Sequence, residues 1–124
     1  NEIIKPLLKY LDETFEDYDN IILASFNKKC LQDIIRYNKS IGLGNKKYLE
    51  KGFITDNIFT NVELLILLKD IEYIIIHWTM LDKELIDYCR KNNKKIYCYT
   101  CKNATQLEYI RDFDIDGIVS DIVL

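Results

Sequence analysis

The chain has 124 residues, with 48% hydrophobic and 30% charged side chains and a formal net charge of −3, which indicates one globular domain rather than a disordered segment. The acidic balance and the lack of a stripe rich in Lys and Arg argue against binding to nucleic acid. No apolar run has the length of a membrane span and no basic, apolar leader opens the chain, so we expect a cytoplasmic protein.

The first part of the chain is typical of a helix, a strand and a second helix. Pro6 suits the first position of a helix, and apolar residues at helical spacing follow it, so a helix is expected over residues 6–17. The apolar run at residues 20–26 has the length of a strand. Asn27 is a suitable N-cap for the next helix, because the residues after it repeat on one apolar face.

The middle of the chain is its least regular part. A brief strand is expected at residues 40–43, which glycines bound. Residues 45–59 show no clear periodicity. Thr60 and Glu63 then match a capping box, in which each side chain bonds the backbone N–H of the other residue, so a helix is expected to begin here.

Two strand–helix pairs and a final strand complete the chain. Residues 72–78 have the strongest strand character in the sequence, and Asp82 is placed to cap the helix after them. Residues 95–100 form the next expected strand, followed by a helix that Asn103 caps. The apolar run at residues 115–119 is expected to be the last strand.

This order alternates helices of about ten residues with short apolar strands, which is typical of an α/β fold with parallel strands and right-handed crossovers. Strands that are apolar along their whole length fit a sheet that helices cover. Five such strands form either an open doubly wound parallel sheet or part of an eight-stranded barrel. Periodicity alone does not separate these two architectures.

Three segments carry a family resemblance. They are Ile21-Ile-Leu-Ala-Ser25-Phe26-Asn27, Ile96-Tyr97-Cys98-Tyr99-Thr100-Cys101 and Asp116-Gly117-Ile118-Val119-Ser120-Asp121. In this order and spacing they resemble the glycerophosphodiester phosphodiesterase family, which has a strand ending Ser-Phe, a later strand reading roughly Val-x-Val-Trp-Thr-Val-Asn, and a last strand Val-Asp-Gly-Ile-Ile-Thr-Asp. The stretch Ile76-His77-Trp78-Thr79 and the helix after it also look like a strand and helix of that family.

The resemblance implies that residues 1–124 form a single partial domain, the C-terminal part of a TIM-type barrel with strands four to eight. Complete members hydrolyse glycerophosphodiesters to glycerol phosphate and an alcohol, so a glycerophosphodiester-type small molecule is the expected ligand. They use a divalent metal, Ca²⁺ or Mg²⁺. Their metal carboxylates and their two-histidine acid/base pair belong mainly to earlier strands, so this chain alone supports no cofactor and no catalytic residue.

The metal-binding strand of that family contains Glu-Ile-Lys, and the only similar segment here is Glu2-Ile-Ile-Lys5. The two charges are three residues apart rather than two, so on a strand they would point to opposite faces. The chain also has a single histidine. Acid/base chemistry that needs two histidines is therefore not expected of this chain alone.

What remains is the wall of a binding site, because barrels place their functional groups at the carboxyl ends of the strands. The residues expected to bind substrate there are Ser25, Phe26, His77, Tyr99, Thr100 and Asp121. Hydroxyls of Ser25 and Thr100 suit a phosphate or glycerol group. Tyr99 stands where the family has Trp, which keeps an aromatic wall, whereas Lys102 replaces the Asn of the family and leaves that contact in question.

Cys98 and Cys101 form a Cys-x-x-Cys motif between a strand and a helix, the layout of a thioredoxin-type redox site. The motif lies near the end of the chain, and alternation along the strand places Cys98 on the face opposite Tyr99. Cys30 and Cys89 are single, so no second pair completes a zinc site. The simpler interpretation is that these cysteines are small, apolar side chains buried in the core.

Two functions from different classes stay open at this point, and a Cys-x-x-Cys redox protein is a lesser alternative. The chain is either part of a phosphodiesterase whose N-terminal half lies elsewhere, or a non-catalytic remnant that acts as a binding or self-associating domain. Exposed edges at both ends of such a sheet would favour a homodimer, because natural proteins pair or cover their sheet edges.

Overall fold

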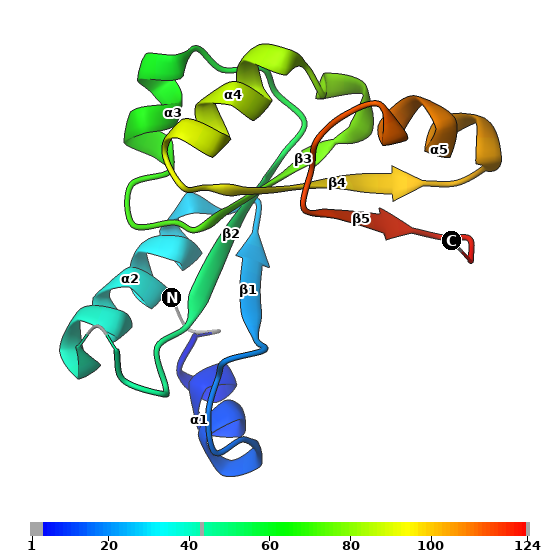
Figure 1. Ribbon diagram of the computed structural model, residues 1–124. Helices are drawn as coiled ribbons and strands as arrows, with labels where there is room; N and C mark the ends of the chain where they lie inside the picture. The colour runs from blue at the N-terminus through cyan, green and yellow to red at the C-terminus, as the bar shows by residue number, and fades with distance from the viewer. Residues whose placement is uncertain (1–3, 43, 124) are drawn as a thin grey trace. The chain divides into compact units, whose positions relative to one another are not determined.

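The computed structural model describes residues 4–42 and 44–123, in two compact units, Asn1–Phe53 and Ile54–Leu124. Helices and strands alternate along the chain in both units (Figure 1). All three strand pairs with a described register are parallel. The α/β class with parallel strands, expected from the alternation of elements, is therefore confirmed.

The first unit begins with α1 (Ile4–Thr14), β1 (Ile22–Ser25) and α2 (Lys28–Ile41), and contains most of β2 (Glu50–Thr55). Strands β1 and β2 pair in parallel, with Ala24 opposite Gly52. Asn27 caps α2 as expected, because its Oδ1 accepts a hydrogen bond of 2.8 Å from the backbone N–H of Lys29. Leu31 and Ile34 of α2 are buried, which accounts for the apolar face of this helix.

The strand expected at residues 40–43 is wrong for residues 40–42, and Leu43 lies outside the described residues. Helix α2 continues to Ile41 and ends at Gly42, whose φ of 87° is a left-handed conformation that glycine adopts readily. The strand of this region is β2, which lies inside the stretch that shows no periodicity. Its first residues, Glu50, Lys51 and Gly52, are depleted in strands, so propensity argues against the element that forms.

Contacts with the residues just before it explain how Lys51 can be buried in a strand. Lys51 is 0% exposed, and its Nζ lies 3.1 Å from the hydroxyl oxygen of Tyr48 and 3.2 Å from the carbonyl oxygen of Leu49. The same ammonium lies 4.6 Å from the centroid of the Tyr48 ring. These contacts offset the cost of removing the charge from water.

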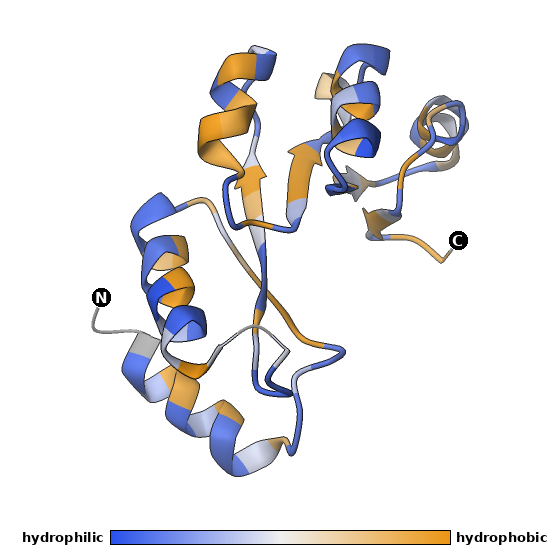
Figure 2. Ribbon diagram, turned by 60° about the vertical axis from the view of Figure 1, so that its left-hand side comes forward, coloured by the Kyte–Doolittle hydropathy of each residue, from blue (hydrophilic) through white to orange (hydrophobic). Residues whose placement is uncertain are grey.

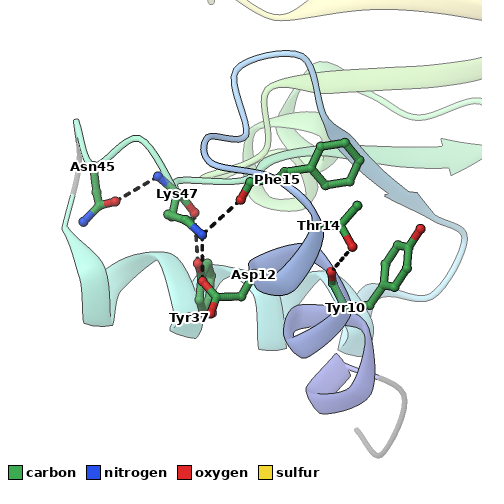
Figure 3. A network of polar contacts seen from close by, with 7 residues as sticks. All are labelled: Tyr10, Asp12, Thr14, Phe15, Tyr37, Asn45 and Lys47. Atoms are coloured by element: carbon green, nitrogen blue, oxygen red, sulfur yellow. Dashed lines mark hydrogen bonds and ion pairs between the residues drawn. The ribbon is translucent and has the colours of Figure 1, made fainter.

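The loop before β2 is tied to both helices of the first unit (Figure 3). The ammonium of Lys47 donates to the Asp12 carboxylate at 2.7 Å and to the carbonyl oxygen of Phe15 at 3.2 Å, so it joins this loop to the end of α1. The hydroxyl of Tyr37 donates to the carbonyl oxygen of Lys47 at 3.0 Å. Lys47 thus links the loop to α2 through its backbone carbonyl and to α1 through its ammonium.

The second unit contains β3 (Tyr73–His77), β4 (Lys95–Cys101) and β5 (Gly117–Ser120), paired in that order and all parallel (Figure 1). Helix α3 (Asn61–Leu67) precedes β3. The short 3₁₀ helix η1 (Trp78–Met80) and α4 (Lys83–Lys91) follow β3, and α5 (Ala104–Arg111) follows β4. The expected elements of this half of the chain are confirmed, with small shifts at their ends.

The three expected helix caps of this unit are also confirmed. Thr60 and Glu63 form both bonds of the capping box, at 3.2 and 3.0 Å. The side chain of Asp82 accepts from the backbone N–H of Leu85 at 2.7 Å, and that of Asn103 accepts from Gln106 at 2.9 Å. Short polar residues before an apolar run therefore fix where these helices begin.

The two faces of β3 and β4 have different roles. Ile74 and Ile76 line a small cavity with Leu64 of α3 and Leu85 of α4, so this face packs against the helices. Tyr73 and Tyr97 lie on the opposite face, where their ring centroids are 5.4 Å apart. Figure 2 shows the helices as mixtures of hydrophobic and hydrophilic residues, as expected of elements with one buried side.

A close approach explains the glycine of the Asp-Gly segment. A Cβ atom at Gly117 would lie 3.0 Å from the Cε1 and Cζ atoms of the Tyr97 ring. The ring of Tyr97 therefore occupies the space where any other residue at position 117 would place its side chain.

Among the residues that the structure describes, no helix has the length and apolarity needed to cross a bilayer.

Candidate functional site

The carboxyl ends of β3 and β4 bring two of the predicted site residues together. His77 and Tyr99 are register partners in the parallel pair, and their ring centroids lie 5.5 Å apart in an edge-to-face arrangement with an interplanar angle of 87°. The hydroxyl of Tyr99 donates to the backbone carbonyl oxygen of Thr55 at 3.3 Å. The pair therefore forms a polar and aromatic surface at one end of the sheet.

Asp56 is a residue of this surface that the sequence analysis missed. It directly follows Thr55, whose carbonyl binds the Tyr99 hydroxyl, and its carboxylate is exposed. Burial and the negative charge of Asp56 raise the pKa of Tyr99 above its ordinary value of 10.0. An acidic residue immediately after a strand was the available signal, and it was lost because β2 itself was not recognised.

The imidazole of His77 is held by the turn that follows it. Its Nδ1 lies 2.7 Å from the Oγ1 of Thr79 and 3.3 Å from the backbone nitrogen of the same residue. His77 is thus the N-cap of η1. The ring also stacks on Trp78, with centroids 5.9 Å apart and an interplanar angle of 27°.

An aromatic row extends from His77 along α5. The ring of Trp78 lies 5.7 Å from that of Tyr109, and the ring of Tyr109 lies 5.3 Å from that of Phe113. Tyr109 is 45% exposed, so part of the row faces solvent. Tyr109 lies on α5 and Phe113 just after the end of this helix, and only the fold brings Tyr109 beside Trp78.

The remaining predicted residues of the second unit lie at the ends of β4 and β5. Thr100 is half-buried and is the second-last residue of β4. Asp121 is exposed and directly follows β5. The backbone N–H of Asp121 donates to the carbonyl oxygen of Cys101 at 2.9 Å, and the hydroxyl of Ser120 donates to the same oxygen at 3.2 Å. These bonds fix the end of β5 and leave the carboxylate of Asp121 at the surface.

Ser25 and Phe26 belong to the first unit and lie at the carboxyl end of β1. The Oγ of Ser25 accepts a hydrogen bond of 2.9 Å from the backbone N–H of Asn27 and so supports the turn into α2. Phe26 is 63% exposed. Both residues have the position in the strand that the sequence predicts, and their role in binding stays a prediction.

The donor set for a divalent metal is incomplete in the described residues. Among them, no three side chains of His, Cys, Asp or Glu come together in a group that could hold a metal ion. Glu2 lies outside the described residues, and Lys5 is an exposed residue of helix α1 rather than of a strand. The described residues therefore do not fit the divalent metal that the family resemblance implies.

The Cys-x-x-Cys motif lies within β4 and is inaccessible. Cys98 and Cys101 are each 0% exposed, and all four cysteines of the chain are free thiols. Burial, and to a smaller extent the charge of the neighbouring Cys101, raise the pKa of the Cys98 thiol to about 11. A thiol in this environment stays protonated at neutral pH, the reverse of what a redox nucleophile requires.

Comparison with known proteins reveals similarity in structure but not in sequence. No protein-family model and no curated protein matches the chain. A phosphodiesterase of Oleispira antarctica, solved in complex with its product sn-glycerol-3-phosphate, is similar over 95% of this chain and 44% of its own, with a TM-score of 0.71 and 15% identity. A protein of Silicibacter pomeroyi DSS-3, assigned as a glycerophosphoryl diester phosphodiesterase, is similar over 81% of this chain and 34% of its own, with a TM-score of 0.65 and 12% identity.

At this identity the similarity shows the fold alone. The chain has the α/β fold of part of a glycerophosphodiester phosphodiesterase barrel, which favours the barrel over the doubly wound sheet. The chain spans less than half the length of each of these two structures.

Proposed function

We propose that this chain is the C-terminal part of a glycerophosphodiester phosphodiesterase-like protein and forms one wall of its substrate pocket. The observation that carries the proposal is the structural similarity over 95% of the chain to a phosphodiesterase that binds sn-glycerol-3-phosphate. In the complete protein, the reaction would convert a glycerophosphodiester to glycerol phosphate and an alcohol.

The groups at the carboxyl ends of the strands suit binding rather than proton transfer. Hydrolysis of a phosphodiester needs a proton donor, a base and positive charge at the phosphoryl oxygens. This chain supplies one histidine, and its described residues form no metal site. His77 and Tyr99 would therefore contact the substrate, with Thr100 and Asp121 at the rim of the same edge, and the acid/base pair would come from the other half.

The proposal is tested with the complete open reading frame from which this chain derives. We expect the full protein to hydrolyse glycerophosphocholine in the presence of Ca²⁺ or Mg²⁺, and residues 1–124 alone to bind sn-glycerol-3-phosphate without hydrolysing the diester. His77→Ala in the full protein should raise KM, because it removes a binding group and no proton-transfer group. A full-length protein that neither hydrolyses a glycerophosphodiester nor binds glycerol phosphate contradicts the proposal.

A second candidate is a non-catalytic domain that binds a ligand or associates with itself. The absence of a second histidine and of a metal site in the described residues favours it. An open reading frame without a further His pair and acidic motifs upstream, together with a dimer in sedimentation equilibrium, would support this candidate over the enzyme.

A further inference from the structure

The contacts of the His77 imidazole determine which of its nitrogens carries the proton. The backbone N–H of Thr79 can only donate, so the Nδ1 that lies 3.3 Å from it must present a lone pair. The Oγ1 of Thr79, at 2.7 Å, must then also act as a donor to this nitrogen. The two donors share the single lone pair of Nδ1, and this arrangement favours the tautomer in which the neutral ring carries its proton on Nε2.

The orientation of the ring is fixed from several sides. Trp78 stacks against it at 5.9 Å, Tyr99 meets it edge to face at 5.5 Å, and Thr79 binds its Nδ1. Within the described part of the chain, no hydrogen bond reaches Nε2. A half-buried N–H at the carboxyl end of a strand is thus available to an acceptor that is not part of this chain.

We propose that Thr79 is a positioning residue, which holds His77 so that its Nε2–H donates to a phosphoryl oxygen of the ligand. This inference rests on the proposed function, because it assigns a role within the same binding edge. Thr79 itself is exposed and lies on η1, and it acts only through the imidazole. The Nε2–H would give an anionic ligand a hydrogen-bond donor at an edge where the carboxylate of Asp56 repels it.

The test uses NMR, because a single histidine gives one pair of imidazole ¹⁵N signals for the whole chain. Residues 1–124 are labelled at histidine and titrated with sn-glycerol-3-phosphate, and then with inorganic phosphate and with glycerol, in mildly alkaline buffer. We expect protonated Nε2 and unprotonated Nδ1 before ligand is added. Glycerol phosphate and inorganic phosphate should then shift the Nε2 signal more than the Nδ1 signal, whereas glycerol alone should leave both in place.

Two variants separate positioning from a merely structural role. Thr79→Val removes the hydroxyl donor, and we expect about fivefold weaker binding of glycerol phosphate and loss of the cross-relaxation between the His77 and Tyr99 rings. Thr79→Ser keeps the hydroxyl, so this variant should retain both the affinity for glycerol phosphate and the cross-relaxation between the two rings. Because Thr79 is exposed, circular dichroism of the two variants should match that of the wild type.

The outcomes distinguish this inference from the proposed function. If the wild type binds glycerol phosphate but Thr79→Val binds it equally well, or if Nδ1 carries the proton, then Thr79 does not position His77 and the inference fails alone. If no signal of the wild-type chain responds to glycerol phosphate, the inference fails because residues 1–124 do not bind the ligand, and the assay of the full-length protein decides the proposed function separately.

Discussion

The phenol of Tyr99, near the carboxyl end of β4, donates a hydrogen bond of 3.3 Å to the backbone carbonyl oxygen of Thr55, the last residue of β2. Forty-four positions of sequence separate the two residues. The bond fixes the aromatic ring that stands beside His77 and places Asp56 next to it.

Replacing Tyr99 with Phe tests this contact. We expect a loss of about 1 kcal/mol in the free energy of unfolding, because the part-buried carbonyl of Thr55 loses its donor. Urea denaturation followed by circular dichroism measures the change. Tyr97→Phe is the matched control on the same strand and should change the free energy by less than about 0.5 kcal/mol.

The same tyrosine predicts a pH dependence. Burial, and then the charge of Asp56, raise the pKa of Tyr99 in the folded chain above its ordinary value of 10.0. The folded state therefore holds this proton more tightly than the unfolded state, and the contribution to stability is complete below pH 10 and lost as the pH rises through the folded pKa. As the pH rises above 10, the free energy of unfolding measured with urea should therefore fall less for the Tyr99→Phe variant than for the wild type.

Arg90 joins α4 to the segment before β5. Its guanidinium donates to the carboxylate of Asp116 at 2.8 Å and to the carbonyl oxygen of Asp114 at 2.9 Å, and Asp116 also accepts from the backbone N–H of Ile96 at 2.8 Å. We expect Arg90→Met to lower the free energy of unfolding by about 1 kcal/mol, which allows for the partial exposure of the pair.

The matched control for Arg90 is Arg36→Met on α2. Arg36 makes a single ion pair of 2.8 Å with Asp33, and its side chain is 76% exposed. An effect below about 0.5 kcal/mol is expected there. Equal losses in the two variants would show that the Arg90 network adds nothing beyond an ordinary surface pair.

Thiol labelling tests the burial of the Cys-x-x-Cys motif. Cys30 is half-buried on α2, whereas Cys89, Cys98 and Cys101 are each 0% exposed. Burial raises the pKa values of Cys89 and Cys98 to about 11. Ellman's reagent at neutral pH should therefore react quickly with one thiol in the folded chain and with all four in urea. Cys30→Ser should remove the fast reaction, and a fast reaction that Cys98→Ser removes instead would revive the redox hypothesis.

Asn38 explains how the chain enters β2. Its amide donates to the carbonyl oxygen of Leu49 at 2.8 Å and accepts from the N–H of Leu49 at 2.9 Å, and the residue is only 4% exposed. Asn38→Ala leaves two buried backbone groups without partners, so we expect a loss of about 2–3 kcal/mol in urea denaturation. Ser40→Ala on the exposed side of the same helix is the control and should cost less than about 0.5 kcal/mol.

The sequence by itself determined the local features of this protein. Asn27, Thr60, Asp82 and Asn103 cap their helices as expected, because a cap depends on a side chain and a backbone N–H only two or three residues away. The strands around Ile74 and Ile96 were also recognisable, because β-branched and aromatic residues, which favour strands, make up most of each. The α/β class followed from the alternation of these elements.

Only the tertiary structure decided where β2 lies and what surrounds Tyr99. Strand β2 contains Glu50, Lys51 and Gly52, which have low strand propensity, and it forms because it pairs with β1 and because Asn38 of α2 binds both backbone groups of Leu49. The bond from Tyr99 to Thr55 and the proximity of Asp56 depend on that strand. Local patterns fix elements through neighbours in sequence, whereas a binding edge is assembled from strand ends that only the packed fold brings together.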